Sequence, residues 1–163
     1  GVNLHCAMHS YRFGDFRKPL KSGADNAKWF EYIGLQSSGH GPQQPIEIKF
    51  ENNVPFITKG IQNWTTQREE LYNNIKILPS AKIVARGVQG NRKAVVAWTN
   101  NYKGTRVFST SIGHNNVTVA DSRYLKLVAR GLLWAVKRED MKIINPKNET
   151  FDLNSKPKAS SAK

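Results

Sequence analysis

All four histidines of the chain lie in loops flanked by glycine or small residues, or at the ends of predicted strands. They are His5, His9, His40 and His114. A neutral imidazole binds divalent metals, and because its charge changes near pH 7 it also serves as a general acid or base. In an α/β sheet with parallel strands, the carboxyl ends of the strands gather at the edge where ligands bind. Because His5 and His114 each follow a predicted strand, we expect them to reach one shared site.

Glu69 and Glu70 are adjacent carboxylates that could join this site. A carboxylate serves as a metal ligand or as a general base, although a solvated strand edge would account for the pair equally well. Three histidines around one metal, with a fourth position open, form a known catalytic arrangement for zinc. We therefore consider a divalent metal such as zinc, bound by His5, His9 and His114.

Flat aromatic faces and hydrogen-bonding side chains elsewhere in the chain suit a sugar ring. Trp64, Tyr72 and Trp98 offer apolar faces, although aromatic residues at strand ends are more often part of a core. Polar side chains near the histidines could bind hydroxyl groups. The residues assigned to substrate binding are His9, Arg12, Gln43, Tyr72, Trp98 and Asn115.

Short strands mixed with helices predict an α/β fold, a sheet flanked by helices. Alternating or apolar runs predict strands over 2–5, 46–50, 82–88, 94–99 and 106–112, with 64–72 either strand or extended loop. Residues 37–42 are glycine-rich and predict a loop, and 100–104 predict a hairpin turn.

Two helices are expected to cover this sheet. Asp25 could cap a short helix that ends at Gly34, and Asp121 could cap a longer one. The longer helix has an apolar stripe at helical spacing, which we expect to face the core. Its members are Leu125, Val128, Ala129, Leu132, Leu133 and Val136. Trp134 is also expected on the buried side.

The chain has 163 residues and a formal net charge of +13. This length fits one domain, which we place at 1–140, followed by a basic tail over 141–163. A strongly basic chain favours acidic partners, but its Lys and Arg are scattered, which is typical of solvated faces. The sequence disfavours nucleic-acid binding, because no known binding motif is present. No apolar run is long enough to span a membrane.

Several motifs, taken in order, resemble the ThuA-like (trehalose utilisation) family of the class I glutamine amidotransferase-like superfamily. They lie at 5–12, 29–30, 39–43, 55–60, 69–72, 97–99, 105–114 and 130–135. This resemblance covers residues 1–140 and implies a flavodoxin-like sheet of which the first strands precede Gly1. We therefore expect the first strand to have neighbours on one side only. Its open edge would be covered by another chain or by further polypeptide.

The single cysteine, Cys6, permits no disulfide within the chain. The resemblance places Cys6 near the nucleophile of class I glutamine amidotransferases and His114 near their histidine. Ala7 and Asn115 depart from the motifs of those enzymes, which disfavours glutamine hydrolysis. A small buried packing role is the expected one for Cys6.

The resemblance implies a bacterial protein, of cytoplasm or periplasm, that processes carbohydrate such as a disaccharide or keto-sugar. As an enzyme it would be an isomerase or hydrolase, with acid–base groups or metal ligands at His5, His40, Glu70 and His114. The alternative is a non-catalytic module that binds sugar or another protein through its basic surface. A catalytic site requires the histidines to converge, whereas a binding module does not.

Overall fold

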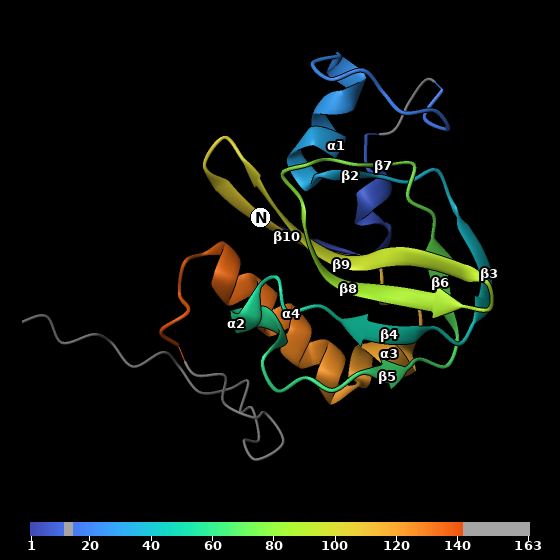
Figure 1. Cartoon of the computed structure of the whole chain (residues 1–163), viewed down its shortest axis with the longest axis vertical. Coiled ribbons are helices and arrows are strands. Elements are labelled where there is room, and N and C mark those ends of the chain that lie inside the picture. The colour runs from blue at the N-terminus through green and yellow to red at the C-terminus, as the bar shows by residue number, and fades with distance from the viewer. Residues whose placement is uncertain (12–14, 142–163) are drawn as a thin grey trace, which may run out of the picture.

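The computed structural model describes residues 1–11 and 15–141, so Arg12 and most of the predicted tail lie outside the described residues (Figure 1). The strands are β1 (Val2–Leu4), β2 (Leu35–Gln36), β3 (His40–Gln44), β4 (Glu47–Phe50), β5 (Trp64–Thr65), β6 (Glu69–Tyr72), β7 (Lys76–Ile77), β8 (Lys82–Gln89), β9 (Arg92–Tyr102) and β10 (Thr105–Thr110). The helices are η1 (His5–His9) and η2 (Asp25–Ala27), both 3₁₀, and α1 (Lys28–Ile33), α2 (Pro55–Thr58), α3 (Asn116–Ala120) and α4 (Ser122–Ala135).

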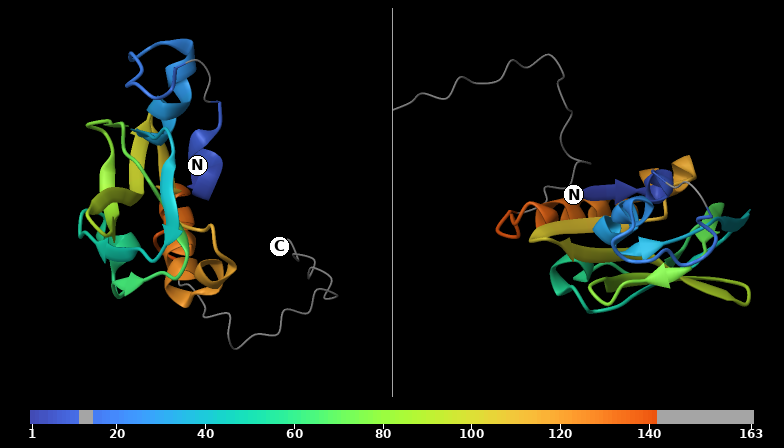
Figure 2. Two further views of the ribbon diagram at one scale, coloured as in Figure 1. Left: turned by 90° about the vertical axis from the view of Figure 1, so that its right-hand side faces the viewer. Right: turned by 90° about the horizontal axis from the view of Figure 1, so that it is seen from above.

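The main sheet has six strands in the order β1-β10-β9-β8-β4-β5, which confirms the predicted α/β class. β1 runs parallel to β10, and the remaining neighbours are antiparallel. The predicted hairpin joins β9 to β10 through Lys103 and Gly104, whose φ angles of 50° and 82° suit a tight turn. Within the described residues β1 pairs on one side only, as expected. It runs beside α4 (Figure 2).

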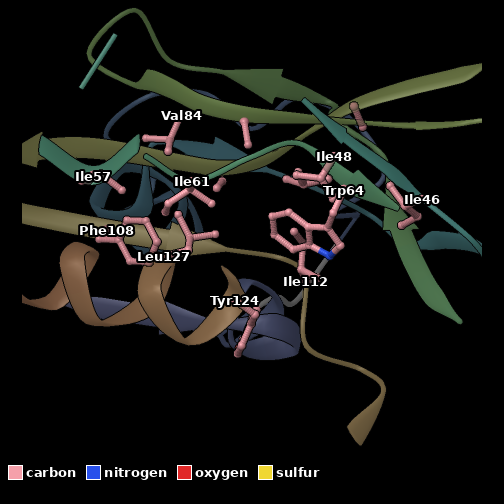
Figure 3. Close-up of a cluster of buried hydrophobic side chains, with 14 of the residues drawn as sticks. Ile46, Ile48, Ile57, Ile61, Trp64, Val84, Phe108, Ile112, Tyr124 and Leu127 are labelled. Atoms are coloured by element: carbon pink, nitrogen blue, oxygen red, sulfur yellow. The ribbon is translucent and has the colours of Figure 1, made fainter. Parts of the chain in front are cut away.

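Both faces of the central strand β9 are buried, so the molecule has two clusters of core side chains. Val96 belongs to the larger cluster, which α4 covers through Leu127 (Figure 3). Its neighbour Val95 points the other way and belongs to the second cluster, which includes Ile33 of α1. Alternation along a strand explains this division, because successive side chains point to opposite faces. In Figure 1, α1 accordingly lies above β9 and α4 lies below it.

Helix α4 begins as predicted, but its buried face is a different one. The Asp121 carboxylate accepts a hydrogen bond from the backbone N–H of Arg123 at 2.8 Å, which confirms the N-cap. The buried positions are Tyr124, Leu127 and Gly131, whereas Leu132 is 48% exposed. Gly131 explains the difference. Any Cβ there would overlap the Phe108 ring, so the helix approaches β10 along its glycine side.

The exposed apolar stripe of α4 consists of Leu125, Leu132 and Val136, three residues of the predicted core face. The prediction that these three residues are buried is wrong. Apolar residues lie on more than one side of α4, so the sequence pattern did not show which side faces the sheet. Trp134 is half-buried against the larger cluster, in agreement with its predicted side. None of the described helices is both long and apolar enough to cross a bilayer.

Three local predictions need correction. Asp25 opens η2 but makes no side-chain cap, and its carboxylate pairs with Lys28 at 2.6 Å. Residues of the predicted loop 37–42 form part of β3, because pairing with β6 supplies backbone hydrogen bonds that glycine content does not reveal. The loop expected after β1 is the 3₁₀ helix η1. The predicted end of α1 at Gly34 is confirmed, with φ of 84°.

Candidate functional site

His5 and His114 leave the sheet at the same edge. His5 follows β1 directly, and His114 comes four residues after the end of β10. Because these strands are parallel, with Leu4 opposite Thr110, the segments that follow β1 and β10 emerge side by side. A left-handed φ of 49° turns the backbone at His5, and the two imidazole rings lie 5.5 Å apart between centroids.

Strand β6 brings Glu70 to these histidines, and its partner β3 brings His40 and Gln43. In the antiparallel pairing His40 lies opposite Tyr72 and Gln43 opposite Glu70. The Glu70 carboxylate, 8% exposed, is the centre of the group. Its contacts with imidazole nitrogens are Oε2 to His5 Nε2 at 3.7 Å, Oε1 to His40 Nε2 at 3.6 Å and Oε1 to His114 Nδ1 at 3.3 Å.

Two hydrogen bonds hold the Glu70 carboxylate in place. Gln43 Nε2 donates to Oε1 at 3.2 Å, and the Tyr72 hydroxyl donates to Oε2 at 3.0 Å. Burial by itself would raise the pKa of Glu70. The two hydrogen bonds and the electrostatic interaction with the neighbouring His40 and His114 together outweigh burial and lower that pKa. Glu70 is therefore a negatively charged group at neutral pH.

Backbone carbonyls fix the tautomers of two imidazoles. His5 Nδ1 lies 3.1 Å from the Ser111 carbonyl oxygen, and His40 Nδ1 lies 2.8 Å from that of Gly41. A carbonyl oxygen only accepts, so each Nδ1 carries the hydrogen. In the neutral ring, Nε2 then turns its lone pair towards the Glu70 carboxylate. Lone pairs that face an anion repel it, so this arrangement calls for a cation, either protons on the rings or a metal ion.

The donor atoms of His5, Glu70 and His114 fit a divalent transition metal. One ligand atom from each residue lies within 4.8 Å of the others. Tetrahedral zinc with bonds near 2.0–2.1 Å holds neighbouring ligand atoms about 3.3 Å apart. Glu70 Oε1 lies 3.3 Å from His114 Nδ1, which is close to that value, whereas the 3.7 Å contact with His5 Nε2 is made by the other oxygen, Oε2. A metal bound through a single carboxylate oxygen would therefore draw these side chains together. Three protein ligands would leave a position open for substrate or water.

The sequence profile of the family described as ThuA, trehalose utilisation, matches residues 19–135. The chain belongs to this family. Two solved ThuA-like proteins share the fold. One, from Parabacteroides merdae, is 18% identical with a TM-score of 0.62, over 87% of this chain and 62% of that one. The other, from Bacteroides uniformis, is 14% identical with a TM-score of 0.59, over 83% of this chain and 57% of that one.

The chain thus spans less than two thirds of the length of these two ThuA-like structures. No curated protein matches it in sequence. The two structural likenesses show the fold of this ThuA family member, and its chemistry must be argued from its own residues.

Other residues that the sequence assigned to the ThuA site have different positions. His9 is outside the three-residue ligand set, and its ring lies 5.0 Å from that of Tyr72. Asn115 adjoins His114, and its side chain caps α3. The assignment of Trp98 to substrate is wrong, because the side chain is in the core, 1% exposed, and its indole N–H donates to the Ile33 carbonyl. Cys6 is exposed, contrary to the buried role expected for it.

Sequence reasoning missed the Ser111 carbonyl that orients His5, since a backbone group leaves no signal in residue type. It assigned Glu70 to the site but gave no physical reason to prefer Glu70 over the adjacent Glu69. The structure separates them, because neighbouring residues of β6 point to opposite sides. Glu70 meets the imidazoles, whereas Glu69 is fully buried against backbone N–H groups of the loop that carries His114.

Proposed function

We propose that this ThuA family protein is a carbohydrate-processing enzyme. In this proposal His5, Glu70 and His114 bind a divalent metal such as zinc, and His40 is the acid–base group. One observation carries the proposal: a buried carboxylate contacts three imidazoles, two of which are held with Nε2 towards it. Such an arrangement is costly to fold and is typical of a ligand or catalytic site.

A bound divalent metal would polarise a carbonyl or hydroxyl oxygen of the sugar. His40 is suited to proton transfer, because its side chain is 39% exposed and can meet a substrate that enters from solvent. The bond from its Nδ1 to Gly41 orients the ring, and Nε2 is left to exchange the proton. Gln43 and Tyr72 keep the Glu70 carboxylate in position.

The description of the family, trehalose utilisation, supports a carbohydrate as the proposed substrate class. A keto-sugar or keto-disaccharide offers vicinal oxygens to a metal and a C–H bond made acidic by a neighbouring carbonyl. In an isomerisation, a base takes the proton from that carbon and, after exchange with solvent, delivers a proton to the adjacent carbon. The hydroxyl proton meanwhile moves from the neighbouring oxygen to the carbonyl oxygen. The step balances without an outside reactant, and it needs one acid–base group of the kind that His40 supplies.

Titration with zinc and cobalt tests the metal site. We expect the wild-type protein to bind one equivalent, and Glu70→Gln to bind at least about 10-fold more weakly, since it loses a ligand. Glu47→Gln is the matched control, because Glu47 is a half-exposed carboxylate paired with Lys49. Equal binding by wild type and Glu70→Gln would contradict the metal assignment.

Proton exchange tests the enzyme assignment. A keto-disaccharide incubated with the protein in D₂O should gain deuterium next to its carbonyl, as measured by NMR. His40→Gln should retain zinc binding and lose most of this exchange, because His40 is outside the ligand set. Sugar binding without exchange or hydrolysis would instead support a non-catalytic sugar-binding module.

A further inference from the structure

We infer that Glu69 is a positioning residue of this site, which holds His114 against Glu70 through the backbone of the loop between β10 and α3. This inference rests on the proposed function, because a positioning role matters only if the site binds a metal. The hydrogen bonds that it is argued from do not depend on any ligand. Glu69 is 0% exposed and lies on β6 immediately before Glu70. A buried carboxylate requires partners, and within the described residues the hydrogen bonds to the Glu69 carboxylate come from this one loop.

Three successive backbone N–H groups donate to the Glu69 carboxylate. Oε2 accepts from Gly113 at 3.2 Å and from His114 at 3.1 Å, and Oε1 accepts from Asn115 at 3.1 Å. Consecutive amides that point at one anion form a nest, and hydrogen bonds to a charged acceptor are about twice as strong as neutral ones. This carboxylate therefore fixes the path of the loop.

Gly113 allows the backbone to adopt that path. Its φ of 127° is unfavourable for other residues, and a Cβ there would lie 2.7 Å from the Tyr124 hydroxyl. Tyr124 is buried on α4, where burial and the nearby charge of Glu69 raise the pKa of its phenol. The loop thus lies between the Glu69 carboxylate on β6 and the neutral Tyr124 phenol on α4.

His114 is consequently held twice by the same strand. Glu69 accepts from its backbone N–H at 3.1 Å, and Glu70 meets its ring Nδ1 at 3.3 Å. Because Glu69 and Glu70 are neighbours on β6, their separation is fixed by the strand. The distance between the His114 ring and the metal-binding carboxylate is then set by β6 before any ligand arrives.

A double-mutant cycle on zinc affinity separates this role from general support of the fold. Glu69→Gln keeps the size of the side chain but removes its charge and one acceptor oxygen. We expect zinc to bind 10–100-fold more weakly, a range typical for loss of a supporting residue. In a His114→Ala background, Glu69→Gln should have no further effect. An equal loss in both backgrounds, or no loss in either, would overturn the inference.

Amide hydrogen exchange provides a readout that needs no metal. Glu69→Gln should speed exchange at Gly113, His114 and Asn115, and should shift the ring ¹⁵N signals of His114 but not of His40. If the wild-type protein binds no zinc, the proposed function fails, and exchange still decides the positioning role. Unchanged protection at 113–115 would overturn that role. If Glu69→Gln does not fold, Glu69→Asp, which keeps the charge on a shorter stem, is measured in the same two ways.

Discussion

The histidine–glutamate site and the contact between α4 and β10 both depend on β10, which packs against α4 and leads into the loop that carries His114, but the site is polar and the α4 contact is apolar. In the site, a buried carboxylate and a buried tyrosine face imidazoles. Under α4, Leu127 and Phe108 are both 0% exposed and form part of a continuous apolar cluster. Burying polar groups favours folding little or not at all, whereas apolar burial is its main driving force. The site should therefore govern ligand binding, and the α4 contact should govern stability.

The largest effect on stability should come from Leu127→Ala. The side chain is fully buried between α4 and the sheet, so truncation leaves a cavity and should lower the free energy of unfolding by about 2–5 kcal/mol. Urea unfolding measures this change. Zinc affinity of the folded variant should match that of the wild type. A loss of affinity would show that the two regions are coupled.

Gly131→Ala should have the next largest effect. The added methyl group would overlap the Phe108 ring, so α4 must move away from β10 at a cost of about 1–3 kcal/mol. Alanine ordinarily strengthens a helix relative to glycine. A gain in stability on thermal melting would therefore show that α4 does not approach β10 this closely.

Glu70→Gln should change how the free energy of unfolding depends on pH in the acidic range. The pKa of Glu70 is lowered in the folded protein, so its ionised form contributes stability above its ordinary value of 4.5, and this contribution disappears as the pH falls through the lowered pKa. The difference in unfolding free energy between wild type and Glu70→Gln should thus shrink from pH 5 to about pH 2.5, a range that lies below the ordinary histidine pKa. Urea unfolding at several pH values measures it, and a constant difference would refute the prediction.

Leu132→Ala should change little, in contrast to Leu127→Ala on the buried side of the same helix. Leu132 is 48% exposed, so we expect the free energy of unfolding to change by no more than about 0.5 kcal/mol. The same urea experiment serves here. A loss comparable with that of Leu127→Ala would mean that Leu132 is covered in solution.

Self-association is the weakest expected effect. The outer edge of β1 is unpaired among the described residues, and the exposed apolar stripe of α4 carries Leu125, Leu132 and Val136. Open edges and apolar patches favour contact with other chains. Sedimentation of the 163-residue chain should show concentration-dependent association, reduced by Leu132→Lys. A monomer at all concentrations would exclude it.

Sequence alone predicted the site better than the packing around it. His5 and His114 were identifiable because each lies at or just after the end of a predicted strand, whereas Glu70 was one of two adjacent carboxylates and its place in the site rested on the family resemblance. The buried side of α4 was missed because apolar residues line more than one side of the helix. Gly131, which allows the close contact with β10, has no side chain and so interrupts the apolar pattern in the sequence. Trp98 was assigned to ligand binding because an aromatic residue near a strand end has the same sequence signature whether it is exposed or buried.

The carbonyls of Ser111 and Gly41 give the site a thermodynamic consequence. Because they hold the Nδ1 hydrogens of His5 and His40, each ring can lose or gain a proton only at Nε2, the atom that faces Glu70. A metal ion that binds at Nε2 must therefore displace any proton carried by that same atom. Because the rings are already oriented, their side chains lose little rotamer entropy when the metal binds. The heat of zinc uptake should accordingly depend on the ionisation enthalpy of the buffer.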